Sequence, residues 1–119
     1  MYKKIGIGAT AITALMLGAS AAMKFKGGPE LTEGFKHLGL PEDLRIGLGI
    51  LELTVLLIYL FPRTSVLGAI LITGYLGGAI CTHLRVGDPI WGPLVPGVLA
   101  WGGLWLRDPR LGDLIPIRK

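Results

Sequence analysis

Charge, histidine and cysteine are all scarce in this chain of 119 residues. Asp, Glu, Lys and Arg make up 17% of it, against about a quarter in soluble globular proteins. The one cysteine, Cys81, excludes an internal disulfide, a Cys-X-X-Cys redox pair and any multi-cysteine metal site. The two histidines, His37 and His83, lie far apart and fit neither zinc nor haem ligand spacing. We therefore expect no metal and no covalently bound cofactor.

Dense basic tracts and phosphate-binding loops are also absent. The net charge is +4, but the basic residues are scattered between apolar runs, so nucleic acid is not an expected partner. No glycine-rich phosphate loop follows a strand pattern, and no serine or cysteine nucleophile motif stands out. Any chemistry must come from a few isolated polar residues.

Four long stretches with almost no charge dominate what is present. They span residues 5–23, 46–61, 65–83 and 90–106, and the one formally charged residue in them is Glu52. At about 1.5 Å per residue such stretches reach roughly 24 to 29 Å, close to the hydrocarbon thickness of a bilayer. A soluble four-helix bundle would show a polar outer face on each helix, which is missing here. The sequence predicts an all-α integral membrane four-helix bundle, with residues 1–119 forming one domain.

Basic residues indicate how such a bundle would be oriented. Four spans place both termini and the short 62–64 connection on one side with seven basic residues, and leave five on the other side. The side richer in Lys and Arg is normally cytoplasmic. We expect a multi-pass protein of the cytoplasmic membrane with both termini in the cytoplasm.

Short connections relate the second and third stretches in space. Only Pro62, Arg63 and Thr64 separate them, which forces an antiparallel helical hairpin. Glu52 lies ten residues before Pro62, and Tyr75 lies eleven residues after Thr64. At helical rise the two side chains are therefore predicted at nearly the same depth.

A set of polar residues is predicted to converge around this pair. Glu52 is the most informative of them, because an unpaired carboxylate in an apolar span is costly and such groups are functional by default. The predicted arrangement is a funnel in which Glu52 and Tyr75 form the floor, Ser20 and Thr82 the walls, and Lys24, His83 and Arg85 the mouth.

Catalytic roles in this funnel are assigned to Glu52 and His83 as proton carriers. The other five residues, Ser20, Lys24, Tyr75, Thr82 and Arg85, are assigned to substrate binding. Each has a plainer interpretation. Glu52 could join two helices through hydrogen bonds, His83 could bond a neighbour at the interface, and Lys24 and Arg85 could extend to the headgroups. Tyr75 could donate a hydrogen bond to Glu52 or to a ligand.

Two further features stay open at this point. Gly74 and Gly78 have the spacing of close-packed membrane helices, and packing alone explains the pair, although small residues there would also leave room for a ligand. His37 lies in the long polar connection before Arg45, where simple solvation explains it.

An ordered set of short motifs carries a family likeness. It comprises Ser20 and Lys24-Phe25, Leu38-Gly39-Leu40-Pro41, Gly49-Ile50-Leu51-Glu52, Gly74-Tyr75, and Thr82-His83-Leu84-Arg85. With these motifs the chain resembles the DoxX-like family of small four-span membrane proteins over nearly its whole length. The resemblance implies a compact helical bundle and an association with quinone-linked or thiol-linked oxidation and oxidative-stress defence.

Three functions are compatible with these observations. The first is binding of a small lipophilic molecule, with a quinone favoured, in support of a membrane oxidoreductase or oxidative-stress system. The second is a cofactor-free acid/base enzyme, an isomerase or hydrolase, acting on a hydrophobic substrate. The third is a non-enzymatic assembly or chaperone-like factor. The expected partners are the lipid bilayer and the lipophilic molecule, with a membrane oxidoreductase and a second copy of the chain left open.

Overall fold

The computed structural model describes residues 2–41 and 43–118, and these residues form helices joined by short connections. Four helices are long: α1 (Tyr2–Lys26), α3 (Leu44–Leu60), α4 (Ser65–Arg85) and α5 (Trp91–Arg107). Three are short: α2 (Pro29–Leu38), the 3-10 turn η1 (Pro62–Thr64) and α6 (Pro109–Gly112). No strand occurs among the described residues, which confirms the all-α prediction.

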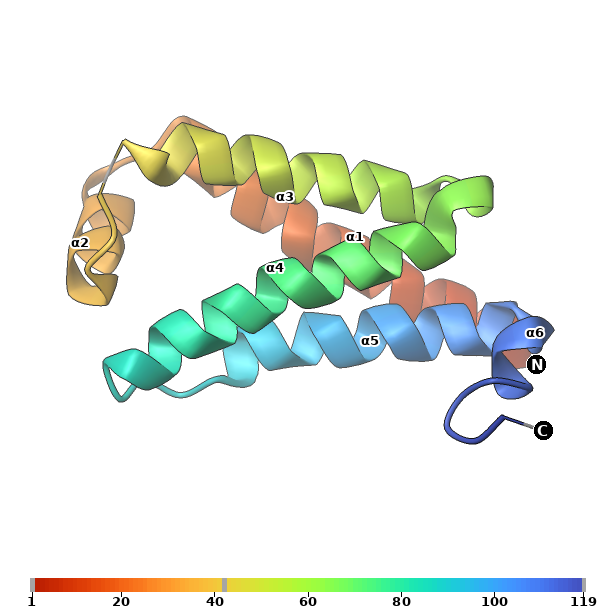
Figure 1. The fold of residues 1–119 in the computed structure, drawn as a ribbon. Helices are drawn as coiled ribbons and strands as arrows, with labels where there is room; N and C mark the ends of the chain where they lie inside the picture. Colours follow the sequence, from red (N-terminus) through yellow and green to blue (C-terminus); the bar gives the residue numbers. More distant parts are fainter. Residues whose placement is uncertain (1, 42, 119) are drawn as a thin grey trace.

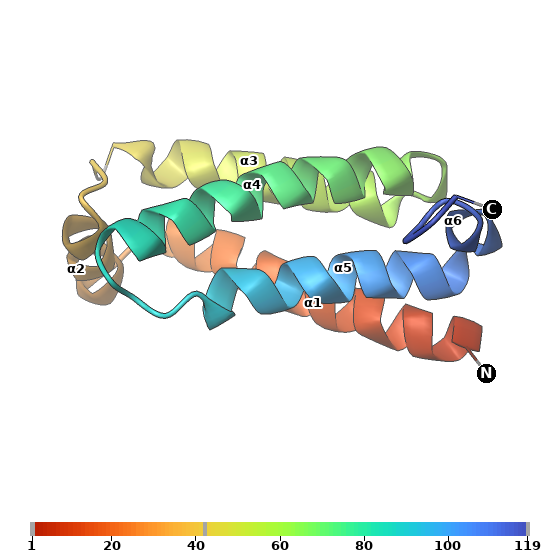
Figure 2. The ribbon, with the colours of Figure 1, turned by 60° about the horizontal axis from the view of Figure 1, so that its bottom comes forward.

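The four long helices form a closed ring. Helix α1 packs against α3 and α5, and α4 packs against the same two neighbours from the opposite side (Figures 1 and 2). The described N- and C-terminal segments lie at one end of the bundle, and α2 lies at the other end beside the α4–α5 connection. The molecule measures 46 × 26 × 21 Å, so its long axis is comparable to a full bilayer.

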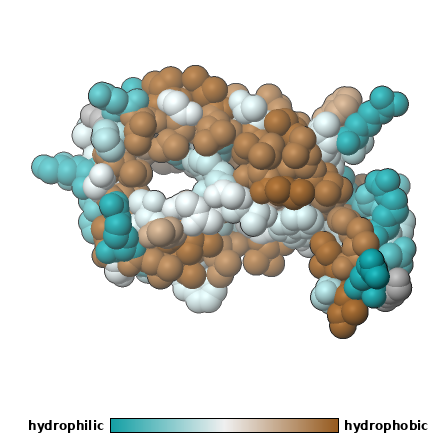
Figure 3. Space-filling view, in the orientation of Figure 1, coloured by the Kyte–Doolittle hydropathy of each residue, from teal (hydrophilic) through white to brown (hydrophobic). Residues whose placement is uncertain are grey.

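Two helical segments among the described residues are long and apolar enough to cross a membrane, Tyr2–Lys26 and Pro62–Arg85. Helices α3 and α5 have 17 residues each, or about 26 Å of rise. Large apolar side chains are exposed along all four long helices, including Leu15, Leu57, Ile70 and Val98. In Figure 3 hydrophobic residues cover the middle of the molecule, and hydrophilic ones gather at its two ends.

The hairpin between α3 and α4 is closed by a very tight contact at Gly68. A Cβ at this position would lie 2.3 Å from the Cα of Tyr59, so only glycine lets the two backbones approach this closely. Ser65 supports the same turn by donating a 2.8 Å hydrogen bond to the Tyr59 carbonyl. The expected antiparallel hairpin is therefore present and held in one register.

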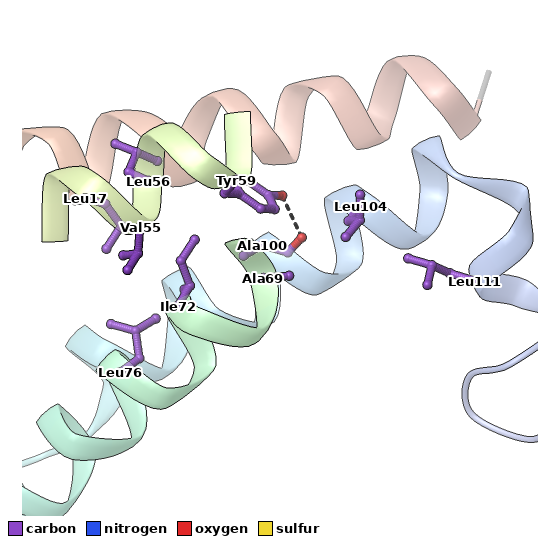
Figure 4. Close-up of a cluster of buried hydrophobic side chains, with 10 residues drawn as sticks. All are labelled: Leu17, Val55, Leu56, Tyr59, Ala69, Ile72, Leu76, Ala100, Leu104 and Leu111. Carbon is purple, nitrogen blue, oxygen red and sulfur yellow. Dashed lines mark hydrogen bonds between the residues drawn. The ribbon is translucent and has the colours of Figure 1, made fainter. Parts of the chain in front are cut away.

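The core lies where the four helices meet, and its centre is Tyr59. The Tyr59 side chain is fully buried, and its hydroxyl donates a 2.6 Å hydrogen bond to the Ala100 carbonyl of α5 (Figure 4). Around it pack small and branched apolar residues from all four long helices. This core occupies the half of the bundle near η1 and the described ends of the chain, and the opposite half, beneath α2, is more open.

Candidate functional site

Glu52 is the centre of a buried polar cluster in the open half of the bundle. It lies on α3 and is 2% exposed. Three donors from two other helices converge on one of its carboxylate oxygens, Oε2. Tyr75 of α4 donates from 2.7 Å, Ser20 of α1 from 3.1 Å, and the Lys24 ammonium of α1 lies at 3.2 Å.

The positions of these donors follow from helix geometry. Ser20 and Lys24 are four residues apart, so they share one face of α1, and Lys24 donates a 2.8 Å hydrogen bond to the Ser20 hydroxyl. Tyr75 reaches Glu52 because η1 fixes the α3–α4 register. The equal depth of Glu52 and Tyr75 was expected from the sequence. In the structure the Tyr75 hydroxyl donates to Glu52, the first of the two interactions considered for it.

The charges of the cluster are matched but incompletely hydrogen-bonded. The Lys24–Glu52 ion pair is shielded from water, with the lysine side chain 13% exposed. The second carboxylate oxygen of Glu52, Oε1, is buried and has no hydrogen-bond partner among the described residues. A buried acceptor without a donor is costly, so Oε1 is the one oxygen of this carboxylate that is still open to a further donor.

A cavity of about 420 Å³ borders this cluster, between α2, α3 and α4. Its walls are mainly leucine side chains from the α2–α3 segment, and Lys24 and Tyr75 supply polar groups on one side. Glu52 does not line the cavity itself. It lies behind Lys24 and Tyr75, which both donate hydrogen bonds to it. Figure 3 shows an opening between the helices in the half of the molecule that carries α2.

Glycine makes room for this cavity. Gly74 and Gly78 both line it, and a Cβ at either position would meet nothing within 4 Å. The first interpretation of this spacing, close packing against another helix, is therefore wrong for the described part of the chain. The glycines leave open space beside Tyr75 instead.

His83 and Thr82 line the same cavity from the last turns of α4. The Nδ1 atom of His83 lies 2.7 Å from the Ala79 carbonyl. Because a carbonyl only accepts, Nδ1 carries the hydrogen, and Nε2 is left for a proton or a ligand. Thr82 donates to the Gly78 carbonyl at 2.8 Å, so its hydroxyl oxygen can still accept a hydrogen bond.

Arg85 takes a different position from the one expected at the funnel mouth. Its guanidinium donates to the Leu38 carbonyl at the end of α2, and it does not contribute to the cavity wall. Ser20 does not line the cavity either. Its hydroxyl donates a hydrogen bond to Glu52 and accepts one from Lys24. The seven predicted residues thus fall into three overlapping groups. The buried cluster comprises Ser20, Lys24, Glu52 and Tyr75, the cavity wall comprises Lys24, Tyr75, Thr82 and His83, and Arg85 contacts α2.

Two polar interactions at this end were not predicted. Arg45, at the start of α3, donates to the carbonyls of Lys24 and Phe25 and so holds the end of α1. His37 is not simply solvated, because its Nε2 lies 2.9 Å from both carboxylate oxygens of Asp88. No local pattern links residues 51 positions apart, and only the route of the long connection brings this pair together.

A second, larger cavity lies elsewhere and carries no comparable chemistry. It is an open apolar groove of about 750 Å³ between α4 and α5. Its few polar groups bond within the protein, as where the Trp101 indole donates to the Thr73 hydroxyl at 2.6 Å. No group of three or more metal-ligating side chains occurs among the described residues. The cavity beside Glu52 is therefore the candidate site.

Comparison with known protein families identifies the family of this chain. A model of the DoxX-like family matches residues 8–103. The chain belongs to the DoxX-like family. No curated protein and no solved structure matches it.

Membership makes this a membrane protein of the DoxX-like family and confirms the resemblance inferred from the short motifs. The matched region contains all seven predicted site residues and ends within α5. Helix α6 and the segment after it lie outside that region.

Proposed function

We propose that this DoxX-like protein crosses the cytoplasmic membrane four times and binds a small lipophilic molecule, with a quinone favoured, in the cavity beside Glu52. In this proposal it supports a membrane oxidoreductase or oxidative-stress system. Both termini face the cytoplasm, and the cavity lies in the opposite half of the bundle, beside α2.

The observation that carries the proposal is the pairing of an apolar cavity with a buried, charged cluster behind one wall. Ligand sites are typically apolar cavities with a few well-placed polar groups. A cavity of about 420 Å³ is also within the usual range for small-molecule sites. An intramembrane ion pair with an unpartnered oxygen has a clearer use in binding or proton exchange than in stability alone.

Lys24 and His83 have complementary abilities toward a ligand. An ammonium group has three hydrogens, and two from Lys24 point to Ser20 and Glu52, which leaves one for a carbonyl oxygen. His83 Nε2 can accept from a hydroxyl when neutral and donate when protonated. A ligand that alternates between carbonyl and hydroxyl forms, as a quinone does, uses both abilities.

Reduction of a quinone consumes two electrons and two protons. In our proposal the electrons come from a partner oxidoreductase, and this chain handles the protons. His83 exchanges one proton directly with the bound molecule, and Glu52 exchanges the second through Lys24 and Tyr75, which are hydrogen-bonded to its Oε2 and line the cavity.

The test is a matched pair of glycine variants in detergent-purified protein. Gly77 and Gly78 are adjacent, and a Cβ at either meets nothing within 4 Å, but Gly78 lines the candidate cavity and Gly77 the α4–α5 groove. We expect Gly78→Leu to weaken binding of a short-chain quinone analogue about tenfold or more, because it fills the cavity. Gly77→Leu should bind as the parent protein does.

Binding is measured by quenching of tryptophan fluorescence, and lipid extracts of the parent protein are examined by mass spectrometry for a co-purified ligand. Equal affinity in the two glycine variants would refute the assignment of the cavity. Failure of the parent protein to bind the analogue, together with ligand-free extracts, would refute the quinone proposal.

A second candidate function is favoured by one observation, that His83 and Lys24 line the same cavity. An imidazole and an ammonium facing one bound molecule suffice for acid/base catalysis without a cofactor. This function predicts turnover of a hydrophobic substrate by the purified protein with no electron donor present. The quinone proposal predicts no turnover under that condition.

A further inference from the structure

The candidate cavity is open on the flank of the bundle. Leu51 of α3 and Gly74 and Gly78 of α4 all line it, and all three residues are exposed. A Cβ at either glycine would meet nothing within 4 Å. Helices α3 and α4 meet at η1 and diverge toward α2 (Figure 1), and the opening in Figure 3 lies between them. We call this gap, bordered by Leu51, Gly74 and Gly78, the side opening.

The side opening lies far from both ends of α4. Gly74 and Gly78 are ten and fourteen residues after Thr64, which places them roughly 15 and 21 Å from η1 along a helix about 30 Å long. Ile70 and Leu67 continue the same face of α4 toward η1, and both are exposed. In the four-span arrangement proposed above, the side opening therefore faces the hydrocarbon of the bilayer.

The end of the cavity that would face the headgroups is covered by α2. Phe35 and Leu38 of α2 line the cavity there, and Phe35 is buried. Two contacts join this helix to the end of α4 and the connection after it. His37 Nε2 lies 2.9 Å from the Asp88 carboxylate, and Arg85 donates to the Leu38 carbonyl. The cavity thus has a wall toward the headgroups and an opening toward the lipid.

The strongest hydrogen-bond donors of the cavity lie on its inner wall. Lys24 belongs to α1, which passes behind α3 and α4 in Figure 1, and its side chain is 13% exposed. The Tyr75 hydroxyl points to the buried carboxylate of Glu52. A molecule that enters through the side opening meets apolar side chains first and the ammonium group last. Such a gradient suits a ligand with a polar head and an apolar tail.

The volume of the cavity limits how much of such a ligand it can hold. About 420 Å³ is near the lower end of the range for sites that enclose a small molecule. A single-ring head fits this space, but a long hydrocarbon tail does not fit beside it. A tail that stays among lipid chains loses nothing, because it remains out of water.

We propose that the ligand is a lipid whose polar head enters the cavity from the bilayer between α3 and α4, while its long tail stays outside along the exposed face of α4. Quinones with a long apolar tail belong to this class. This ligand class rests on the function proposed above, whereas the exposure of the side opening to lipid is tested without any ligand.

The ligand-free test uses a nitroxide spin label on full-length protein in lipid vesicles. In a Cys81→Ser background, Gly78→Cys places the label at the side opening, Ile70→Cys on the exposed face of α4 and Glu33→Cys on the exposed face of α2. Electron paramagnetic resonance measures collisions of the label with oxygen, which concentrates in lipid, and with a nickel chelate, which stays in water.

We expect the label at Gly78→Cys to match that at Ile70→Cys, with frequent oxygen collisions and rare chelate collisions. Collision rates closer to those at Glu33→Cys would overturn the proposal, because the cavity would then open to water.

The path of the tail is tested with a matched pair of tryptophan variants. Leu51 and Ile50 are neighbours that are 47% and 54% exposed, but Leu51 lines the cavity and Ile50 does not. The probes are two benzoquinones with the same ring, one with a decyl tail and one with a methyl group in its place. Isothermal titration calorimetry in detergent micelles measures their binding.

We expect Leu51→Trp to weaken binding of the decyl probe about tenfold or more and of the methyl probe less than about threefold, because it narrows the side opening through which the tail passes. Ile50→Trp should bind both probes as the parent protein does. Equal weakening of both probes by Leu51→Trp, or none, overturns the tail path while the ligand site stands. If the spin label meets lipid but the parent protein binds neither probe, the side opening stands and the quinone proposal fails.

Discussion

Glu52 joins three helices through one buried carboxylate and lies beside the candidate cavity. Its Oε2 accepts from Ser20, Lys24 and Tyr75, so the cluster connects three helices through a single atom. Removing one member of a buried ion pair leaves an unpaired charge, which costs more than the pair itself contributes. The two charges should therefore depend on each other.

A double-mutant cycle tests this dependence. Glu52→Gln and Lys24→Met should each lower the free energy of unfolding by about 3 kcal/mol, because each leaves the opposite charge buried and unpaired. The double variant should lose clearly less than the sum of the two single losses. Unfolding in detergent micelles measures all four proteins, and strict additivity would contradict a direct ion pair.

At the scale of elements, glycines perform two different tasks in the same helix. Gly68 lets α4 approach Tyr59 of α3, whereas Gly74 and Gly78 leave the cavity open further along. The first task sets the α3–α4 register on which the Glu52–Tyr75 contact depends. The second provides space beside that contact.

Alanine substitutions should separate these tasks. Gly68→Ala should lower the free energy of unfolding by about 3 kcal/mol, because its Cβ would lie 2.3 Å from the Tyr59 backbone. Gly74→Ala, on the same helix, should be neutral or slightly stabilising, since a Cβ there meets nothing within 4 Å and alanine favours helix over glycine. Thermal unfolding of both variants measures the difference, and similar losses would contradict the assigned contact.

Helix α6 offers a pH-dependent element away from the candidate site. Asp108 accepts hydrogen bonds from the Arg110 backbone and guanidinium, and the guanidinium bond lowers the pKa of the Asp108 carboxyl. A lowered folded-state pKa means that the bond stabilises α6 above the ordinary pKa of aspartate. That stabilisation is lost as pH falls through the folded-state value.

NMR of the Arg110 backbone amide in micelles measures this loss directly. Its chemical shift should stay constant from neutral pH downward, and should move only below the pH at which an ordinary aspartate titrates. Asp108→Asn should abolish the movement. A midpoint at or above the ordinary aspartate value would contradict the bond.

At the scale of the whole molecule, one end of the bundle is closed and the other is open. The closed end holds Tyr59, its bond to Ala100 and the Arg107 guanidinium 5.8 Å from the Tyr59 ring centroid. The open end holds the polar cluster, the cavity and α2. In our proposal the closed end faces the cytoplasm, which predicts a specific labelling pattern.

Single cysteines in a Cys81→Ser background test the four-span topology. Arg63→Cys and Asp113→Cys should react with a membrane-impermeant maleimide in inside-out vesicles, and Glu33→Cys in right-side-out vesicles. Reaction of Arg63→Cys and Glu33→Cys from the same side would refute the membrane crossing by α3. Reaction of Asp113→Cys from the side opposite Arg63→Cys would show that α4 and α5 do not both cross the membrane.

The sequence alone determined the helices, the hairpin and the family, because apolar runs, a three-residue turn and short motifs are local properties. The equal depth of Glu52 and Tyr75 followed from the same turn. The sequence also placed Ser20, Lys24 and Tyr75 near Glu52, as the structure has them. It did not separate the buried cluster from the cavity wall, and it did not predict the contact of Arg85 with α2.

Only the tertiary structure decided how α1, α2 and the α4–α5 connection meet at the open end. The convergence of Ser20 and Lys24 on one oxygen of Glu52, the empty space beside Gly74 and Gly78, and the His37–Asp88 contact all join elements distant in the chain. Such contacts depend on how helices pack and on the path of a long connection. Local periodicity contains no information about either.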